Sequence, residues 1–177
     1  DVTTRVATAV AAQAAPPAIF SYQTSASYVL NANNLAISQA QLEAAQEFRD
    51  WYLVAPSYPV TDKSGHLDPN GSRWLGMQFG KVMHQVLDLG RGWMPVHPTR
   101  ATWRGRQILI DFHVPHPPLQ FQAAYAALVA TTYSGYGFRV TDDAGTLTLA
   151  SVEIVGDACV LITVTRDLST NPYVWYG

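Results

Sequence analysis

The stretch that decides the fold of this chain is Tyr58-Pro-Val-Thr-Asp62-Lys-Ser-Gly-His66-Leu-Asp68-Pro69-Asn-Gly71-Ser-Arg-Trp74-Leu-Gly76. Asp68 is a preferred helix N-cap, and Pro69 suits the first helical position because its missing N–H would be unpaired there anyway. Apolar residues then recur every three to four positions. We therefore expect a polar loop that leads to His66 and then a helix over about 69–88.

The residues before this stretch predict alternating helices and strands. Helices are expected over 2–14 and 35–51, and short strands over 17–23 and 51–55. This alternation implies parallel strands joined by crossover helices, with functional groups in the loops beyond the carboxyl ends of the strands. The His66 loop follows the second strand. Because two strands are too few for a stable sheet of this kind, we expect the others in a segment that precedes Asp1.

The second half of the chain has a different pattern, and we expect a boundary between a domain over 1–92 and another over 96–177. Short strands separated by turn signals, such as 142–145, predict an antiparallel sandwich. Residues 117–135 are an exception, with a brief helix expected over 122–129. The expected strands lie at 100–104, 106–113, 137–141, 146–155, 158–165 and 172–176.

Composition limits the classes of partner. The 177 residues are 48% apolar and 14% charged, which is typical of a globular protein. A net charge of -2 without a basic stripe gives no reason to expect nucleic acid. The longest apolar stretches are far shorter than the roughly 20 residues that cross a bilayer, so no membrane partner is expected. The single Cys159 excludes an intrachain disulfide, and we interpret it as a small core residue in a strand.

The block from Gly65 to Gly76 resembles the last conserved block of the SGNH (GDSL-type) hydrolases, particularly the sialate O-acetylesterase-like branch of bacteria and phages. In that family, an Asp and a His lie a few residues apart in the loop before the final helix. Residues 19–23, 36–43 and 54–58 also resemble that branch. The resemblance implies an α/β plus all-β fold: the C-terminal part of an SGNH hydrolase with a flavodoxin-like parallel sheet over 1–92, then an antiparallel β-sandwich.

The same resemblance implies hydrolysis of esters, often acetyl groups on carbohydrate, by a serine nucleophile without metal or cofactor. His66 would be the general base and Asp62 would orient it. Asp62 lies four residues before His66 rather than the usual three, with Lys63 at the expected place, and Asp68 is disfavoured as the acid by its capping role.

The nucleophile block of that family, Gly-Asp-Ser, and its oxyanion blocks do not occur in these 177 residues. We therefore expect a preceding segment or a separate chain to supply the serine and the oxyanion donors, and acetylated carbohydrate to be the substrate. The chain alone is expected to be inactive.

Several alternatives remain open. His66 could be an ordinary loop residue, and His84 is expected to be a packed or half-exposed helix side chain. Asp111, His113 and His116 suggest a metal site, but the prolines around them make an extended strand exit the better interpretation. Five aromatic residues could fill the sandwich core or stack on sugar rings. They are Trp93, Trp103, Tyr173, Trp175 and Tyr176.

A hypothesis of a different class is a non-catalytic carbohydrate-binding or structural module of a phage or cell-surface protein. The sequence does not determine the compartment; an extracellular or virion-associated location is compatible with either hypothesis.

Overall fold

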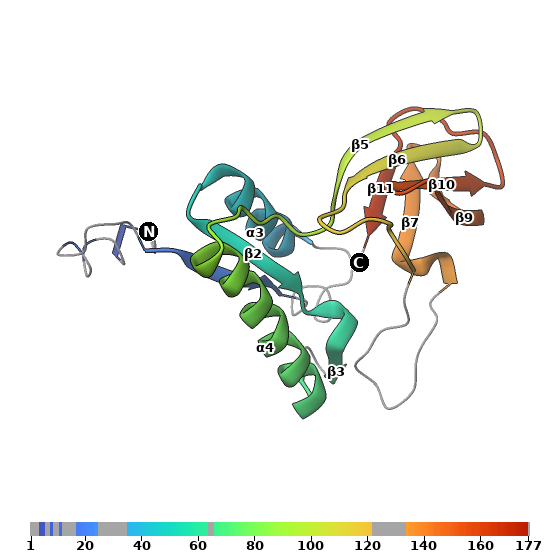
Figure 1. Cartoon of the computed structure of the whole chain (residues 1–177). Coiled ribbons are helices and arrows are strands. Elements are labelled where there is room, and N and C mark those ends of the chain that lie inside the picture. The colour runs from blue at the N-terminus through green and yellow to red at the C-terminus, as the bar shows by residue number, and fades with distance from the viewer. Residues whose placement is uncertain are drawn as a thin grey trace. The chain divides into compact units, whose positions relative to one another are not determined.

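The computed structural model describes residues 4, 5, 8, 11, 17–24, 35–63, 66–121 and 134–176, with the backbone alone for 61–63. The chain forms two compact units, Asp1–Met94 and Pro95–Gly177, and strands outnumber helices among the described residues (Figure 1). This sheet-rich mixed fold agrees in outline with the expected α/β plus all-β class.

A parallel pair of strands lies in the first unit. Strand β1 (Ile19–Gln23) pairs with β2 (Trp51–Pro56), and helix α3 (Ala36–Glu47) connects them. The helix predicted over 35–51 was too long, because Phe48 has an extended backbone and Trp51 is already paired with Ile19. A larger flavodoxin-like sheet stays a prediction.

Helix α4 (Pro69–Met83) packs against this pair. It begins at the predicted residue and continues as a π-helical segment, η2 (His84–Asp88). The core of the unit consists of Val54 and Ala55 of β2 with Leu75 and Val82 of α4. Burying one Val or Leu side chain stabilises a fold by about 1.5–3 kcal/mol. Among the described residues, no helix has the length and apolarity that a membrane span needs.

The second unit contains two antiparallel sheets, with the strand orders β5-β6-β10-β9 and β11-β7-β8. Its strands are β5 (His97–Arg104), β6 (Gln107–His113), β7 (Phe138–Asp142), β8 (Gly145–Leu147), β9 (Leu149–Val155), β10 (Cys159–Val164) and β11 (Tyr173–Tyr176). A short 3-10 segment, η3 (Ser134–Gly137), precedes β7.

Both sheets contribute to one core, the arrangement of a β-sandwich. Burial alternates along β6 and β10, as expected for strands with one face against the core. The buried core residues are Ile108, Ile110, Phe112, Phe138, Val140, Leu147, Val160, Ile162 and Val164.

One strand prediction was wrong in this unit. The strand expected over 146–155 is two strands in two different sheets: Leu147 of β8 pairs with Val140, whereas Leu149 of β9 pairs with Val164. The helix predicted over 122–129 and most of that over 2–14 lie outside the described residues.

Candidate functional site

The predicted site lies on the connection from β2 to α4. The strands β1 and β2 end side by side, where the backbone N–H of Ser57 donates to the carbonyl of Gln23 at 2.8 Å. The chain then forms a short 3-10 turn, η1 (Tyr58–Val60), and two short antiparallel strands, β3 (Thr61–Lys63) and β4 (His66–Leu67). The connection therefore leaves from the carboxyl end of the parallel pair, where functional groups of such sheets gather.

His66 is the first residue of β4 and its side chain is exposed. Its backbone partner across the ribbon is Lys63, and the register is irregular between Thr61 and Lys63, where Asp62 lies. The carboxylate of Asp62 is outside the described part of the chain. The pairing of Asp62 with His66 therefore stays a prediction.

The start of α4 is held by two close contacts. The carboxylate of Asp68 accepts a hydrogen bond from the backbone N–H of Gly71, so this acid is the helix cap that the sequence predicts. Gly71 is buried, and a Cβ at this position would lie 2.5 Å from the carbonyl oxygen of Val60. The cap and this close approach fix the helix start at Pro69, shortly after His66.

A second histidine forms a carboxylate pair in the same unit. His84 Nδ1 lies 2.6 Å from Asp88 Oδ2 within η2, and the two side chains are 61% and 65% exposed. Sequence reasoning missed this pair, although the spacing of four residues on a predicted helix is the signal for such a contact. It is a surface pair on one helical segment.

The residues that suggested a metal site are engaged in other contacts. Asp111 accepts a hydrogen bond from Cys159 Sγ at 3.2 Å, and the ring of His113 packs beside that of His97 with 5.2 Å between centroids. Within the described ranges, no three His, Cys, Asp or Glu side chains are grouped so that they could hold a metal ion. Cys159 is half-buried rather than a core residue, and its hydrogen bond to Asp111, with burial, raises the pKa of the thiol.

Three of the five aromatic residues contact residues outside this group, and the ring of Tyr173 lies beside that of Trp175 with 6.5 Å between centroids. Trp93 Nε1 donates to the Leu53 carbonyl at 2.9 Å, Trp175 Nε1 donates to Thr141 Oγ1 at 3.1 Å, and the Tyr176 ring packs beside that of Phe138.

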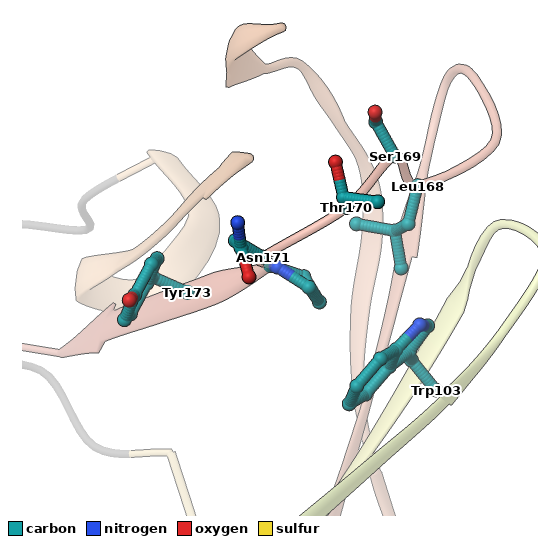
Figure 2. Close-up of a pocket in the computed structure, with 7 residues that line it drawn as sticks. Trp103, Leu168, Ser169, Thr170, Asn171 and Tyr173 are labelled. Atoms are coloured by element: carbon teal, nitrogen blue, oxygen red, sulfur yellow. The ribbon is translucent and has the colours of Figure 1, made fainter. Parts of the chain in front are cut away.

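The other two aromatic residues, Trp103 and Tyr173, are 56% and 61% exposed. Both line an open depression in the second unit, which Figure 2 shows. The sequence placed them among possible sugar-stacking residues but did not indicate the loop that joins them in this depression.

Comparison with known proteins identifies a similar fold. No protein-family model matches the chain, and no curated protein matches it significantly. A carbohydrate acetylesterase from Xanthomonas citri has a similar structure, with a TM-score of 0.60 and 12% identity over 99% of this chain. The chain spans 39% of the length of that acetylesterase.

A weaker match is the N-terminal part of a bacterial S-layer protein, with a TM-score of 0.36, 13% identity and coverage of 86% of this chain and 31% of that one. The likeness to the acetylesterase is one of fold.

Proposed function

We propose that this chain is part of a serine carboxylester hydrolase that removes acetyl groups from carbohydrate. The observation that carries the proposal is the fold shared with a carbohydrate acetylesterase over 99% of this chain. The resemblance of residues 65–76 to the last block of the SGNH hydrolases supports the same activity independently. The nucleophile and the oxyanion donors come from a preceding segment of the same polypeptide or from a separate chain.

In this mechanism His66 removes the proton from the serine hydroxyl as its oxygen attacks the ester carbonyl. His66 then returns that proton to the oxygen of the leaving sugar, and an acetyl-enzyme remains. A water molecule, deprotonated by His66, attacks the acetyl carbonyl; acetate leaves and the serine is protonated again. Asp62 orients the imidazole and stabilises its charged form.

The exposure of His66 supports this role, because a base that serves a hydroxyl from another segment must be accessible to it. The position at the carboxyl end of the β1–β2 pair supports it as well. Each oxyanion donor from the other segment would stabilise the transition state by about 3 kcal/mol.

The decisive measurement is hydrolysis of p-nitrophenyl acetate and of an acetylated oligosaccharide by the longer polypeptide that contains the Gly-Asp-Ser block. We expect His66→Ala to reduce kcat by at least about a thousandfold. His84→Ala is the matched control: it removes an exposed histidine that is paired with Asp88, and it should retain turnover. Full turnover by the His66→Ala protein contradicts the proposal.

A second pair of variants identifies the acid. Asp62→Asn should lower kcat and change its pH profile, because the imidazolium loses its counter-charge. Asp68→Asn keeps a good N-cap side chain and should leave kcat unchanged. The opposite result would assign the orienting role to Asp68.

Labelling of the longer polypeptide with a fluorophosphonate probe separates this proposal from a non-catalytic module. Covalent labelling that disappears in His66→Ala supports the hydrolase. A polypeptide that neither reacts with the probe nor hydrolyses esters would be a binding or structural module instead.

A further inference from the structure

The depression in the second unit, residues 95–177, has a volume of about 740 Å³ and is open to solvent. This size lies within the range of small-molecule binding sites, about 300–1,000 Å³. Figure 2 shows Trp103 on a neighbouring strand beside the segment that carries Leu168 to Asn171, and Tyr173 further along that segment. The lining residues are Trp103, Leu168, Ser169, Thr170, Asn171, Pro172 and Tyr173.

The register of β5 determines the face of the sheet on which Trp103 lies. Trp103 of the edge strand β5 pairs directly with Ile108 of β6, and directly paired residues of antiparallel strands point to the same face of the sheet. Ile108 is a core residue with 2% exposure, so Trp103 lies on the core-side face and is nevertheless 56% exposed. The inner face of β5 thus presents an indole ring to solvent.

The loop 165–172, between β10 and β11, is held in place before any ligand arrives. Asp143 accepts hydrogen bonds from Thr170 Oγ1 at 2.6 Å and from Asn171 Nδ2 at 3.0 Å. The N–H of Leu168 donates to the carbonyl of Gly105 at 3.0 Å, which ties the loop to the turn between β5 and β6. A preformed surface loses less conformational entropy on binding than a mobile one.

The chemistry of the lining indicates the class of ligand. Among the described residues, those that line the depression include no Asp, Glu, Lys, Arg or His, so no charged side chain forms its wall. It combines two aromatic rings with hydroxyl and amide groups; Thr170 Oγ1 donates to Asp143 and keeps lone pairs that can accept.

A pyranose ring has apolar C–H faces and a rim of hydroxyl groups, which match aromatic faces and polar side chains respectively. We infer that the second unit binds a neutral carbohydrate chain across Trp103 and Tyr173. An open depression suits the interior of a chain, which continues beyond the site at both ends. This inference uses none of the residues proposed for ester hydrolysis and does not depend on that activity.

Titration of the complete chain with soluble hexasaccharides tests the inference. The probes are cellohexaose, xylohexaose and mannohexaose, with hexagalacturonate as an anionic comparison, followed by isothermal titration calorimetry and tryptophan fluorescence. We expect at least one neutral probe to bind. Trp103→Ala and Tyr173→Ala should each weaken that binding by about tenfold or more, because each removes a stacking face.

Three further variants are controls. Trp103→Phe keeps an aromatic face and should retain most of the affinity. Tyr22→Ala removes a tyrosine of the first unit that is 43% exposed, and it should bind like the unchanged protein. His66→Ala should bind normally even if it proves inactive, which separates this site from the proposed hydrolase. Circular dichroism checks that every variant is folded.

Three results would overturn the inference. They are binding of none of the neutral probes, preference for hexagalacturonate, and neutral binding that persists in both alanine variants. Trp103→Ala could disturb the edge strand. Tyr173 is 61% exposed, so we expect Tyr173→Ala to fold and to provide the test in that case.

Discussion

Arg166 donates two hydrogen bonds to the carboxylate of Asp142, from Nη1 to Oδ2 at 2.7 Å and from Nη2 to Oδ1 at 2.8 Å. The Asp142 side chain is completely covered, and its oxygens also accept the backbone N–H groups of Ala144 and Ser169. These contacts join the turn between β7 and β8 to the loop after β10. They therefore hold the two sheets of the second unit together at this end of the sandwich.

Asp142→Asn should destabilise the second unit, because it leaves the Arg166 guanidinium without its counter-charge. We expect the midpoint of its thermal unfolding to fall by at least about 4 °C in differential scanning calorimetry. Asp167→Asn is the control: its carboxylate is 76% exposed and meets Arg106 Nε at 3.1 Å, and exposed pairs contribute little to stability. Equal losses in the two variants would contradict a special role for Asp142.

The same carboxylate should make stability depend on acid pH. The pKa of Asp142 lies well below its ordinary value of 3.8. The largest cause is the hydrogen bond from Arg166, followed by that from the Ser169 N–H, whereas burial acts to raise the pKa. Because the unfolded chain binds this proton at a higher pH, the contribution of Asp142 is full above its ordinary pKa and is lost as the pH falls below it.

Melting curves between about pH 5 and pH 2 measure this effect, and the midpoint should fall less steeply in Asp142→Asn than in the unchanged protein. Parallel slopes in the two proteins would assign the acid sensitivity to other carboxylates.

Local signals made part of the fold predictable. Asp68 and Pro69 mark the start of α4 because the capping contact involves only neighbouring residues. The break between β8 and β9 has no such signal: Leu147 and Leu149 continue one alternating pattern, and their partners, Val140 and Val164, are set by tertiary pairing. Local periodicity indicates a strand but not the sheet to which it belongs.

The candidate sites also differ in whether a local sequence signal predicts them. The sequence places His66 after the second strand of the parallel pair, because chain order alone decides that position. Asp142 and Asp143 were predicted only as turn residues. The contact of Asp142 with Arg166 and that of Asp143 with Asn171 form only because β10 lies beside β6 and the chain then crosses to the other sheet. The depression at Trp103 depends on that crossing and therefore has no local signal.

Two glycines of α4 should respond oppositely to alanine. A Cβ at Gly71 would lie 2.5 Å from the Val60 carbonyl oxygen, so Gly71→Ala should cost about 1–3 kcal/mol of unfolding free energy through overpacking. At exposed Gly76 nothing lies within 4 Å of a Cβ, and Gly76→Ala should add about 0.5–1 kcal/mol because alanine favours the helix. Urea unfolding measures both values; a stable Gly71→Ala protein would show that η1 can move away from α4.

The single thiol provides a probe of the contact between β6 and β10. The hydrogen bond from Cys159 Sγ to Asp111, followed by burial, raises the pKa of the thiol, so less of the reactive thiolate is present near pH 8. Asp111→Asn removes the negative acceptor and should increase the rate of alkylation by iodoacetamide severalfold, as measured by mass spectrometry. Asp157→Asn removes an exposed charge two residues from the thiol while the hydrogen bond stays, so its rate should change much less. If both variants reacted equally fast, general electrostatics would explain the low reactivity, and the contact with Asp111 would not.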